Sequence, residues 1–194
     1  MNKKRTILMA NDDGVWSPLL RDFAVKLRAE GFRVVIAAPD RDRSAISHSI
    51  TLFQPLRAHE IETDCFAVSG TPVDCVYLGL LHLLPELPDL VVSGINNGFN
   101  LGADVFYSGT VAAAMEGGFR KVPSMAFSLD PITRKEGGKE AIEKAIKYAT
   151  KLVMAALNGE MHPGTTWNIN MPSDCDGRFR FTRIGTRRYS DRVE

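Results

Sequence analysis

Residues 6–14 read Thr-Ile-Leu-Met-Ala-Asn-Asp-Asp-Gly, an apolar run that stops at two adjacent carboxylates. Such a run is typical of a buried β-strand that ends in a polar loop. Ser17 and Pro18 follow, and they supply the N-cap and the first-turn proline of a helix. Residues 32–38, Phe-Arg-Val-Val-Ile-Ala-Ala, return to a strand pattern that Pro39 ends. The strand–helix–strand order predicts parallel strands and an α/β fold.

The same alternation continues along the chain. Thr71 and Pro72 open a second helix by the same cap chemistry, and residues 50–68 before them form a strand-rich excursion. Further strands are expected at 89–93, 124–129, 166–171 and 179–184, and further helices at 111–117 and 139–157. We therefore predict a single α/β domain with a mainly parallel sheet.

The composition narrows the function classes. Of the 194 residues 44% are apolar, and 24 Lys and Arg against 23 Asp and Glu give a net charge of +1. This excludes a disordered chain, and the near-zero charge is unlike that of proteins that bind nucleic-acid polymers. Three widely spaced cysteines, with no Cys-x-x-Cys pair, argue against a disulfide scaffold or a structural zinc site. With no apolar run near the roughly 20 residues of a membrane span, we expect a cytoplasmic protein that binds no membrane.

Polar clusters follow three of the predicted strands at their carboxyl ends, at residues 11–14, 39–44 and 93–100. In an open α/β sheet the ligand crevice lies at this edge, so these distant segments are expected to converge on one site. Asp12 and Asp13 repel each other, and a divalent cation with oxygen ligands, Mg²⁺ or Mn²⁺, would remove that penalty. The same Asn-Asp-Asp-Gly sequence also suits a turn, and spacing alone leaves both interpretations open.

A glycine-rich segment, residues 94–102, precedes Ser108, Gly109 and Thr110. Glycines allow the backbone to approach a ligand closely, and the helix that follows Thr110 offers free N–H groups that suit a phosphate. An ordinary Ser/Thr helix cap explains these three residues equally well. The standard glycine-rich phosphate motifs are absent from the sequence.

Five blocks in this order carry a family resemblance: residues 7–14, 38–45, 69–76, 92–98 and 100–111. Together they closely resemble the SurE family, the stationary-phase survival protein phosphatases, and the resemblance extends from Ile7 to about Tyr189. It implies a Rossmann-like three-layer fold. It also implies a divalent-metal-dependent phosphatase that hydrolyses nucleoside 5′-monophosphates. Members of the family often also act on 3′-nucleotides, and some act on short polyphosphate.

The resemblance assigns roles to particular residues. The metal ligands that it implies, for one Mg²⁺ or Mn²⁺ ion per subunit, are Asp12, Asp13, Ser44 and Asn96. The phosphate- and substrate-binding residues that it implies are Asn11, Asn100, Ser108, Gly109 and Thr110. Attack by a metal-activated water, with Asp12 or Asp13 as the base, and direct attack by an Asp carboxylate both remain open.

The resemblance also bears on assembly. Residues 1–194 are expected to form a single SurE-like phosphatase domain without the C-terminal arm that family members usually exchange between subunits. A homodimer or homotetramer is expected, and that arm normally contributes to it. The alternative function is a nucleotide-binding or receiver-like signalling module without phosphatase activity.

Overall fold

The computed structural model describes residues 4–131 and 138–186, and within them seven strands form one sheet in the order β3-β4-β2-β1-β5-β6-β7. The strands are β1 (Thr6–Ala10), β2 (Arg33–Pro39), β3 (Ala58–Glu62), β4 (Cys65–Val68), β5 (Leu90–Asn97), β6 (Ser124–Leu129) and β7 (Thr166–Met171). All neighbouring strands run parallel except β3, which pairs antiparallel with β4. The predicted, mainly parallel α/β sheet is confirmed.

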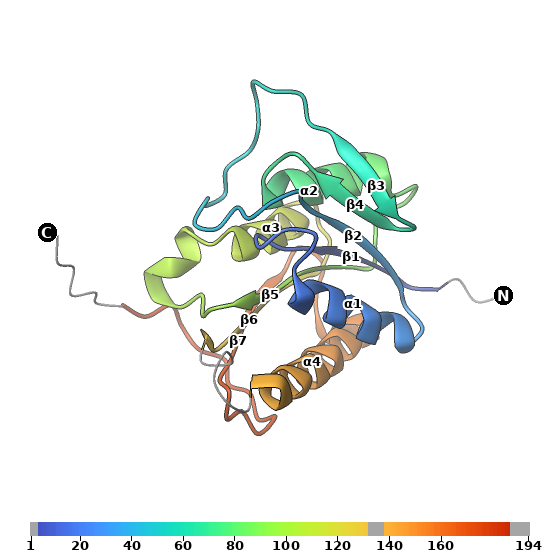
Figure 1. Cartoon of the computed structure of the whole chain (residues 1–194). Helices are drawn as coiled ribbons and strands as arrows, with labels where there is room; N and C mark the ends of the chain where they lie inside the picture. The colour runs from blue at the N-terminus through green and yellow to red at the C-terminus, as the bar shows by residue number, and fades with distance from the viewer. Residues whose placement is uncertain (1–3, 132–137, 187–194) are drawn as a thin grey trace, which may run out of the picture.

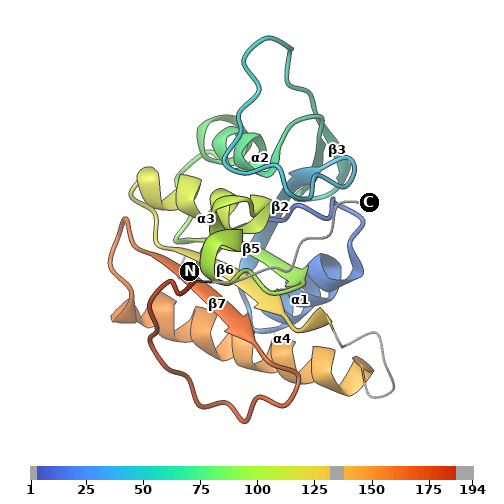
Figure 2. The same cartoon turned by 90° about the vertical axis from the view of Figure 1, so that its left-hand side faces the viewer.

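Helices cover both faces of the sheet (Figure 1). They are α1 (Pro18–Ala29), α2 (Pro72–Leu78), α3 (Gly109–Phe119) and α4 (Gly138–Ala155), with short turns η1 (Gly79–Leu83), η2 (Gly102–Phe106) and η4 (Ala156–Glu160). Helices α1 and α4 lie on one face and α2 and α3 on the other, and Figure 2 shows the same division from the side. This is the expected three-layer arrangement. None of the helices in the described ranges is long and apolar enough to cross a membrane.

The alternation of side chains along the central strands fills both cores. Ile7 and Met9 of β1 pack with α1 and α4, whereas Leu8 and Ala10 pack on the α2 and α3 side. Because β1 pairs with both β2 and β5, with Ala10 beside Ser93, the carboxyl ends of these three strands lie at one edge of the sheet. The polar clusters predicted to converge therefore share that edge.

The long loop between β2 and β3 passes over α2, and side-chain hydrogen bonds attach it there (Figures 1 and 2). Asp74 accepts hydrogen bonds from Thr51 N at 3.0 Å and Thr51 Oγ1 at 2.6 Å. The same carboxylate accepts from Thr71 N at 2.8 Å, as half of a capping box at the start of α2. Asp74 thus holds both the helix start and the loop that carries Ser44.

One predicted strand and the end of another were wrong. Residues 179–184, which the structure describes, form no strand, and Phe179 and Phe181 are 67% and 83% exposed. Their alternating pattern matched a half-buried strand, but Phe181 makes an edge-to-face ring contact with Trp167 of β7 where backbone pairing was expected. Strand β5 runs on to Asn97, beyond the predicted end at Ser93, because a register shift lets Asn96 pair with Ser128 of β6.

Candidate active site

Asp12 joins the end of β1 to the start of α3. Its side chain is buried, with 4% exposed, and Oδ1 accepts a 2.5 Å hydrogen bond from Thr110 Oγ1. Oδ2 accepts a second bond, of 3.1 Å, from Thr110 N. Burial raises the pKa of the Asp12 carboxyl above its usual value, and the hydrogen bonds from Thr110 offset part of that increase. A nearby cation would stabilise the charged form of a buried carboxylate in this setting.

Gly109 allows this close approach of α3 to β1. A Cβ at this position would lie 2.9 Å from Asp12 Cβ and 3.2 Å from its Oδ2. Ser108 caps the helix, because its Oγ accepts a 3.1 Å bond from Val111 N. Two first-turn N–H groups, those of Thr110 and Val111, are therefore engaged within the protein. The bond from Thr110 N places the Asp12 carboxylate at the positive end of the helix dipole.

The loop after β2 meets the loop after β1. Arg43 N donates a 2.7 Å bond to Asp12 O, and Val15 N donates a 2.8 Å bond to Pro39 O. Ser44 follows Arg43 directly, is exposed, and donates its N–H to Asp42 Oδ1 at 2.8 Å. The structure thus brings the segment that ends at Ser44 to the loop after β1, through the bond of Arg43 N to Asp12 O.

Asn96 lies on the neighbouring strand at the same edge. The pairing of Ala10 with Ser93 sets the end of β5 next to the loop that contains Asp13, which is partly exposed. Asn96 Nδ2 donates a 2.8 Å bond to Gly98 O, which engages the amide as a donor and spares its carbonyl oxygen. Asn96 is thus placed to offer an oxygen ligand.

The donor set fits a hard divalent cation. Two carboxylates, a hydroxyl and a carboxamide supply oxygen atoms only, the set that Mg²⁺ and Mn²⁺ prefer. Asn11 adds a buried amide whose Nδ2 donates to Gly14 O at 2.9 Å, while its Oδ1 has no partner among the described residues. Those residues also contain no cluster of three or more His, Cys, Asp and Glu side chains suited to a metal. A cation at this edge must therefore draw on neutral oxygens as well.

Asn100 is buried and is held by two strands that sequence reasoning did not connect with the site. Its Nδ2 donates to Ser128 Oγ of β6 at 2.8 Å, and its backbone bonds to Asn168 and Asn170 of β7. The signal was available, because residues 167–170 read Trp-Asn-Ile-Asn, and a period-2 pattern of asparagines on a strand marks one polar face.

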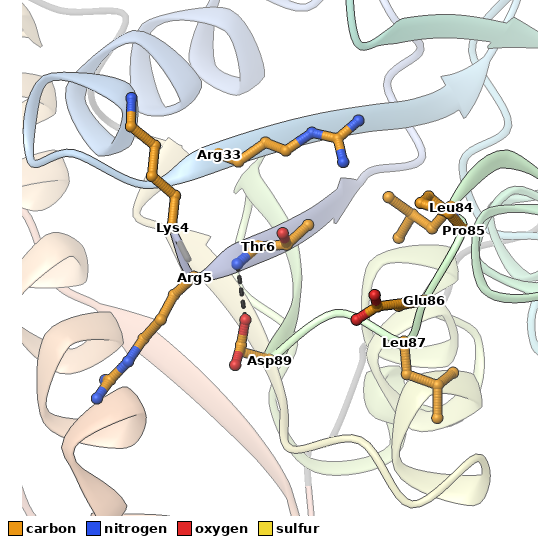
Figure 3. Close-up of a pocket in the computed structure, with 9 residues that line it drawn as sticks. All are labelled: Lys4, Arg5, Thr6, Arg33, Leu84, Pro85, Glu86, Leu87 and Asp89. Atoms are coloured by element: carbon orange, nitrogen blue, oxygen red, sulfur yellow. Dashed lines mark hydrogen bonds between the residues drawn. The ribbon is translucent and has the colours of Figure 1, made fainter. Parts of the chain in front are cut away.

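A pocket lies at the opposite edge of the sheet from these residues (Figure 3). It surrounds the amino ends of β1 and β2, where Thr6 pairs with Arg33. Two of its charged groups are bonded within the protein: Asp89 Oδ2 accepts a 2.7 Å bond from Thr6 N, and Arg33 forms an ion pair with Asp64 at 2.6 Å. The predicted site residues lie at the other ends of these strands, so this pocket is not the candidate site.

The family model described as Survival protein SurE matches residues 7–191. This chain belongs to the SurE family. The 5′-nucleotidase SurE of Syntrophotalea carbinolica is 47% identical over 188 residues, covering 96% of this chain and 73% of that protein. The 5′-nucleotidase SurE of Vibrio parahaemolyticus is 45% identical, covering 98% of this chain and 72% of that protein.

A solved SurE structure has the same fold. The crystal structure of the SurE protein from Aquifex aeolicus superposes with a TM-score of 0.78 at 43% identity, covering 87% of this chain and 66% of that one. The chain thus spans about two thirds to three quarters of the length of these SurE relatives. The cited curated relatives are named as enzymes, which does not favour the alternative of a signalling or binding module without phosphatase activity.

Proposed function

We propose that this SurE-family chain is a divalent-cation-dependent 5′-nucleotidase that hydrolyses nucleoside 5′-monophosphates to nucleoside and phosphate. The nucleotidase activity is supported by relatives of that name at 45–47% identity over nearly the whole chain. The observation that carries the assignment of the site is the buried Asp12 carboxylate, held between the end of β1 and the positive end of α3. That position suits a group that holds a cation next to a phosphate.

The proposed metal ligands are Asp12, Asp13, Ser44 and Asn96. When bound, a divalent cation offsets the charge of the phosphate dianion and acidifies water. Thr110 fixes the Asp12 carboxylate through two hydrogen bonds, so this ligand is oriented before any cation arrives.

Four of the proposed phosphate-binding residues lie at the start of α3 and in the loop before it: Asn100, Ser108, Gly109 and Thr110. The fifth, Asn11, directly follows β1. Helix N-terminal groups stabilise the charge that develops on the transferring phosphoryl group, and their position is set by the fold before the substrate binds.

The proton-accepting base is proposed to be Asp13. Both oxygens of Asp12 accept hydrogen bonds from Thr110, whereas Asp13 is more exposed and lies next to it in the chain. In this mechanism Asp13 accepts the proton of the attacking water, and the alternative is direct attack by the Asp13 carboxylate on phosphorus. The stereochemical course at phosphorus distinguishes the two, because one in-line attack by water inverts the configuration, whereas formation of an aspartyl-phosphate and its hydrolysis at phosphorus are two displacements that retain it.

We further propose Mg²⁺ or Mn²⁺ as the ion, one per subunit, and a homodimer or homotetramer in the cytoplasm. The oxygen-only donor set supports the choice of ion. The burial of Cys65 and Cys75, neither of them in a disulfide, is consistent with a reducing compartment. Metal analysis of the purified protein tests the ion, and light scattering tests the assembly.

The test of the function is phosphate release from AMP with Mg²⁺ or Mn²⁺ and then with EDTA. Asp12→Asn and Asp13→Asn remove one ligand charge each and are expected to abolish the metal-dependent rate. Asp22→Asn is the matched control, because Asp22 is an exposed carboxylate on α1. Equal activity in EDTA would overturn the metal assignment. Failure of the folded protein to release phosphate from any nucleotide would overturn the proposed nucleotidase activity.

A further inference from the structure

We infer that Asn170 and Asn168 of β7 are positioning residues for the substrate phosphate, because they fix the loop that carries Asn100. The inference rests on the proposed function, since it takes the ligand of this loop to be the phosphate of a nucleotide. Neither asparagine is one of the site residues that the sequence predicted.

Asn170 pairs with the backbone of Asn100 as a neighbouring strand would. Its Oδ1 accepts a 2.8 Å bond from Asn100 N, and its Nδ2 donates a 3.1 Å bond to Asn100 O. One carboxamide thus satisfies the N–H and the C=O of a single residue. Asn168 Nδ2 donates a further bond of 2.9 Å to Asn100 O. The main chain at Asn100 is therefore fixed from β7, 70 residues further along the chain.

Asn168, Asn170 and their three hydrogen bonds to the Asn100 backbone are here called the clamp. The clamp continues as a polar row across three strands. Asn170 lies in register with Ser128 of β6, and Ser128 lies in register with Asn96 of β5. Ser128 Oγ accepts a 2.8 Å bond from Asn100 Nδ2. In-register residues of parallel strands point to the same face, so this row connects the proposed metal ligand Asn96 to the clamp.

The row lies on the face of the sheet that α3 covers. Ala126, two residues before Ser128, packs with Val111 and Ala114 of α3, whereas Phe127 packs on the opposite face with α1 and α4. Asn168 is exposed and Asn170 is partly exposed, so the clamp borders solvent at the carboxyl edge. A ligand that lies between the start of α3 and the loop at Asn100 would meet a backbone whose position β7 sets.

This arrangement separates substrate binding from metal binding. Asn96 is held within paired strand β5 and by its own bond to Gly98 O, so loss of the clamp leaves it in place. Asn100 depends on β7 for the hydrogen bonds of both its N–H and its C=O group. Loosening of the clamp is therefore expected to weaken phosphate binding and to leave cation activation unchanged.

The test compares Asn170→Leu and Asn168→Leu with two controls. Leu has the same number of side-chain heavy atoms and the same branching at Cγ as Asn, and it removes the hydrogen bonds. Asn158→Leu is the same change at the opposite edge of the sheet, where the Asn158 side chain lies near Arg5. Ser173→Ala is a local control, because its Oγ bonds to Asp130 and not to Asn100.

Asn170→Leu is expected to raise KM for AMP and the inhibition constant of inorganic phosphate together, by about tenfold, as lost hydrogen bonds of ordinary strength would. The kcat and the Mn²⁺ concentration for half activation should stay at their wild-type values. Asn168→Leu, which removes one bond, should produce a smaller change in the same direction. Both controls should match the wild type.

A second measurement does not depend on activity. Hydrogen exchange at the Asn100 amide, followed by NMR or mass spectrometry, should be about tenfold faster in Asn170→Leu than in wild type, since its acceptor is gone. Unchanged exchange, an unchanged KM, or a Mn²⁺ activation constant that moves together with KM would each overturn the inference. If the wild type hydrolyses no nucleotide, the proposed function fails. The role of the clamp is then still tested by comparing the Asn100 exchange rate and the affinity for inorganic phosphate between Asn170→Leu and wild type.

Discussion

Replacement of Thr110 by Val tests whether Asp12 is held ready for a cation. The change keeps the shape of the side chain and removes the 2.5 Å bond from Thr110 Oγ1 to Asp12 Oδ1. A buried hydrogen bond to a charged group contributes about 1.5–3 kcal/mol. Loss of a residue that orients a metal ligand typically weakens metal affinity about 10–100-fold. The Mn²⁺ concentration for half activation is therefore expected to rise by about that factor.

The same variant has a pH signature. The hydrogen bond from Thr110 lowers the pKa of the Asp12 carboxyl, which burial raises. Its removal raises that pKa further, so Asp12 stays protonated to a higher pH and cannot serve as an anionic ligand there. The acidic limb of the pH–rate profile should therefore move to higher pH.

The assay is the initial rate of AMP hydrolysis, titrated with Mn²⁺ at several pH values. Thr110→Ser keeps the hydroxyl and should retain the wild-type activation constant. Thr150→Val is the matched control, because Thr150 is also buried but donates to the Ile146 carbonyl of its own helix. An activation constant and an acidic limb in Thr110→Val that equal those of Thr150→Val would refute the reasoning.

Three further predictions address packing, capping and thiol chemistry. Gly109→Ala places a Cβ 2.9 Å from Asp12 Cβ, so steady-state kinetics should show a loss of kcat of at least about tenfold. Asp74→Asn replaces one acceptor oxygen by an NH₂ group that faces a Thr51 donor. The free energy of unfolding measured with urea should therefore fall by about 2–3 kcal/mol. Cys175 is the most exposed of the three cysteines, and a thiol reagent should label it first in the native protein, with the other two labelled only on unfolding.

The sequence predicted the features that depend on local patterns and on the parallel order of the strands. Asp12 and Ser44 follow β1 and β2, Asn96 lies near the end of β5, and parallel pairing alone brings the ends of these strands to one edge. The cap residues also marked the starts of their helices. Ser108 and Thr71 accept the hydrogen bonds that their type predicts, whereas Ser17 occupies the N-cap of α1 without a side-chain cap hydrogen bond.

The remaining features depend on contacts between distant segments. Nothing local marks Asn170 as the partner of the Asn100 backbone, because the pair depends on the order of β5, β6 and β7 in the sheet. The strand expected at 179–184 was wrong for the opposite reason, since a strand-like alternation of side chains does not supply a neighbouring strand to pair with.

The contact between Asp12 and Thr110 spans 98 residues, and that between Asn100 and Asn170 spans 70. No short stretch of the chain therefore carries the site, and chain entropy must be lost across most of the fold before its groups meet. A molecule in which one of these segments has frayed therefore has no working site, and an early folding intermediate that lacks β7 has none either. Phosphatase activity should disappear in the same cooperative transition as the sheet, which makes catalysis a reporter of the integrity of the whole domain.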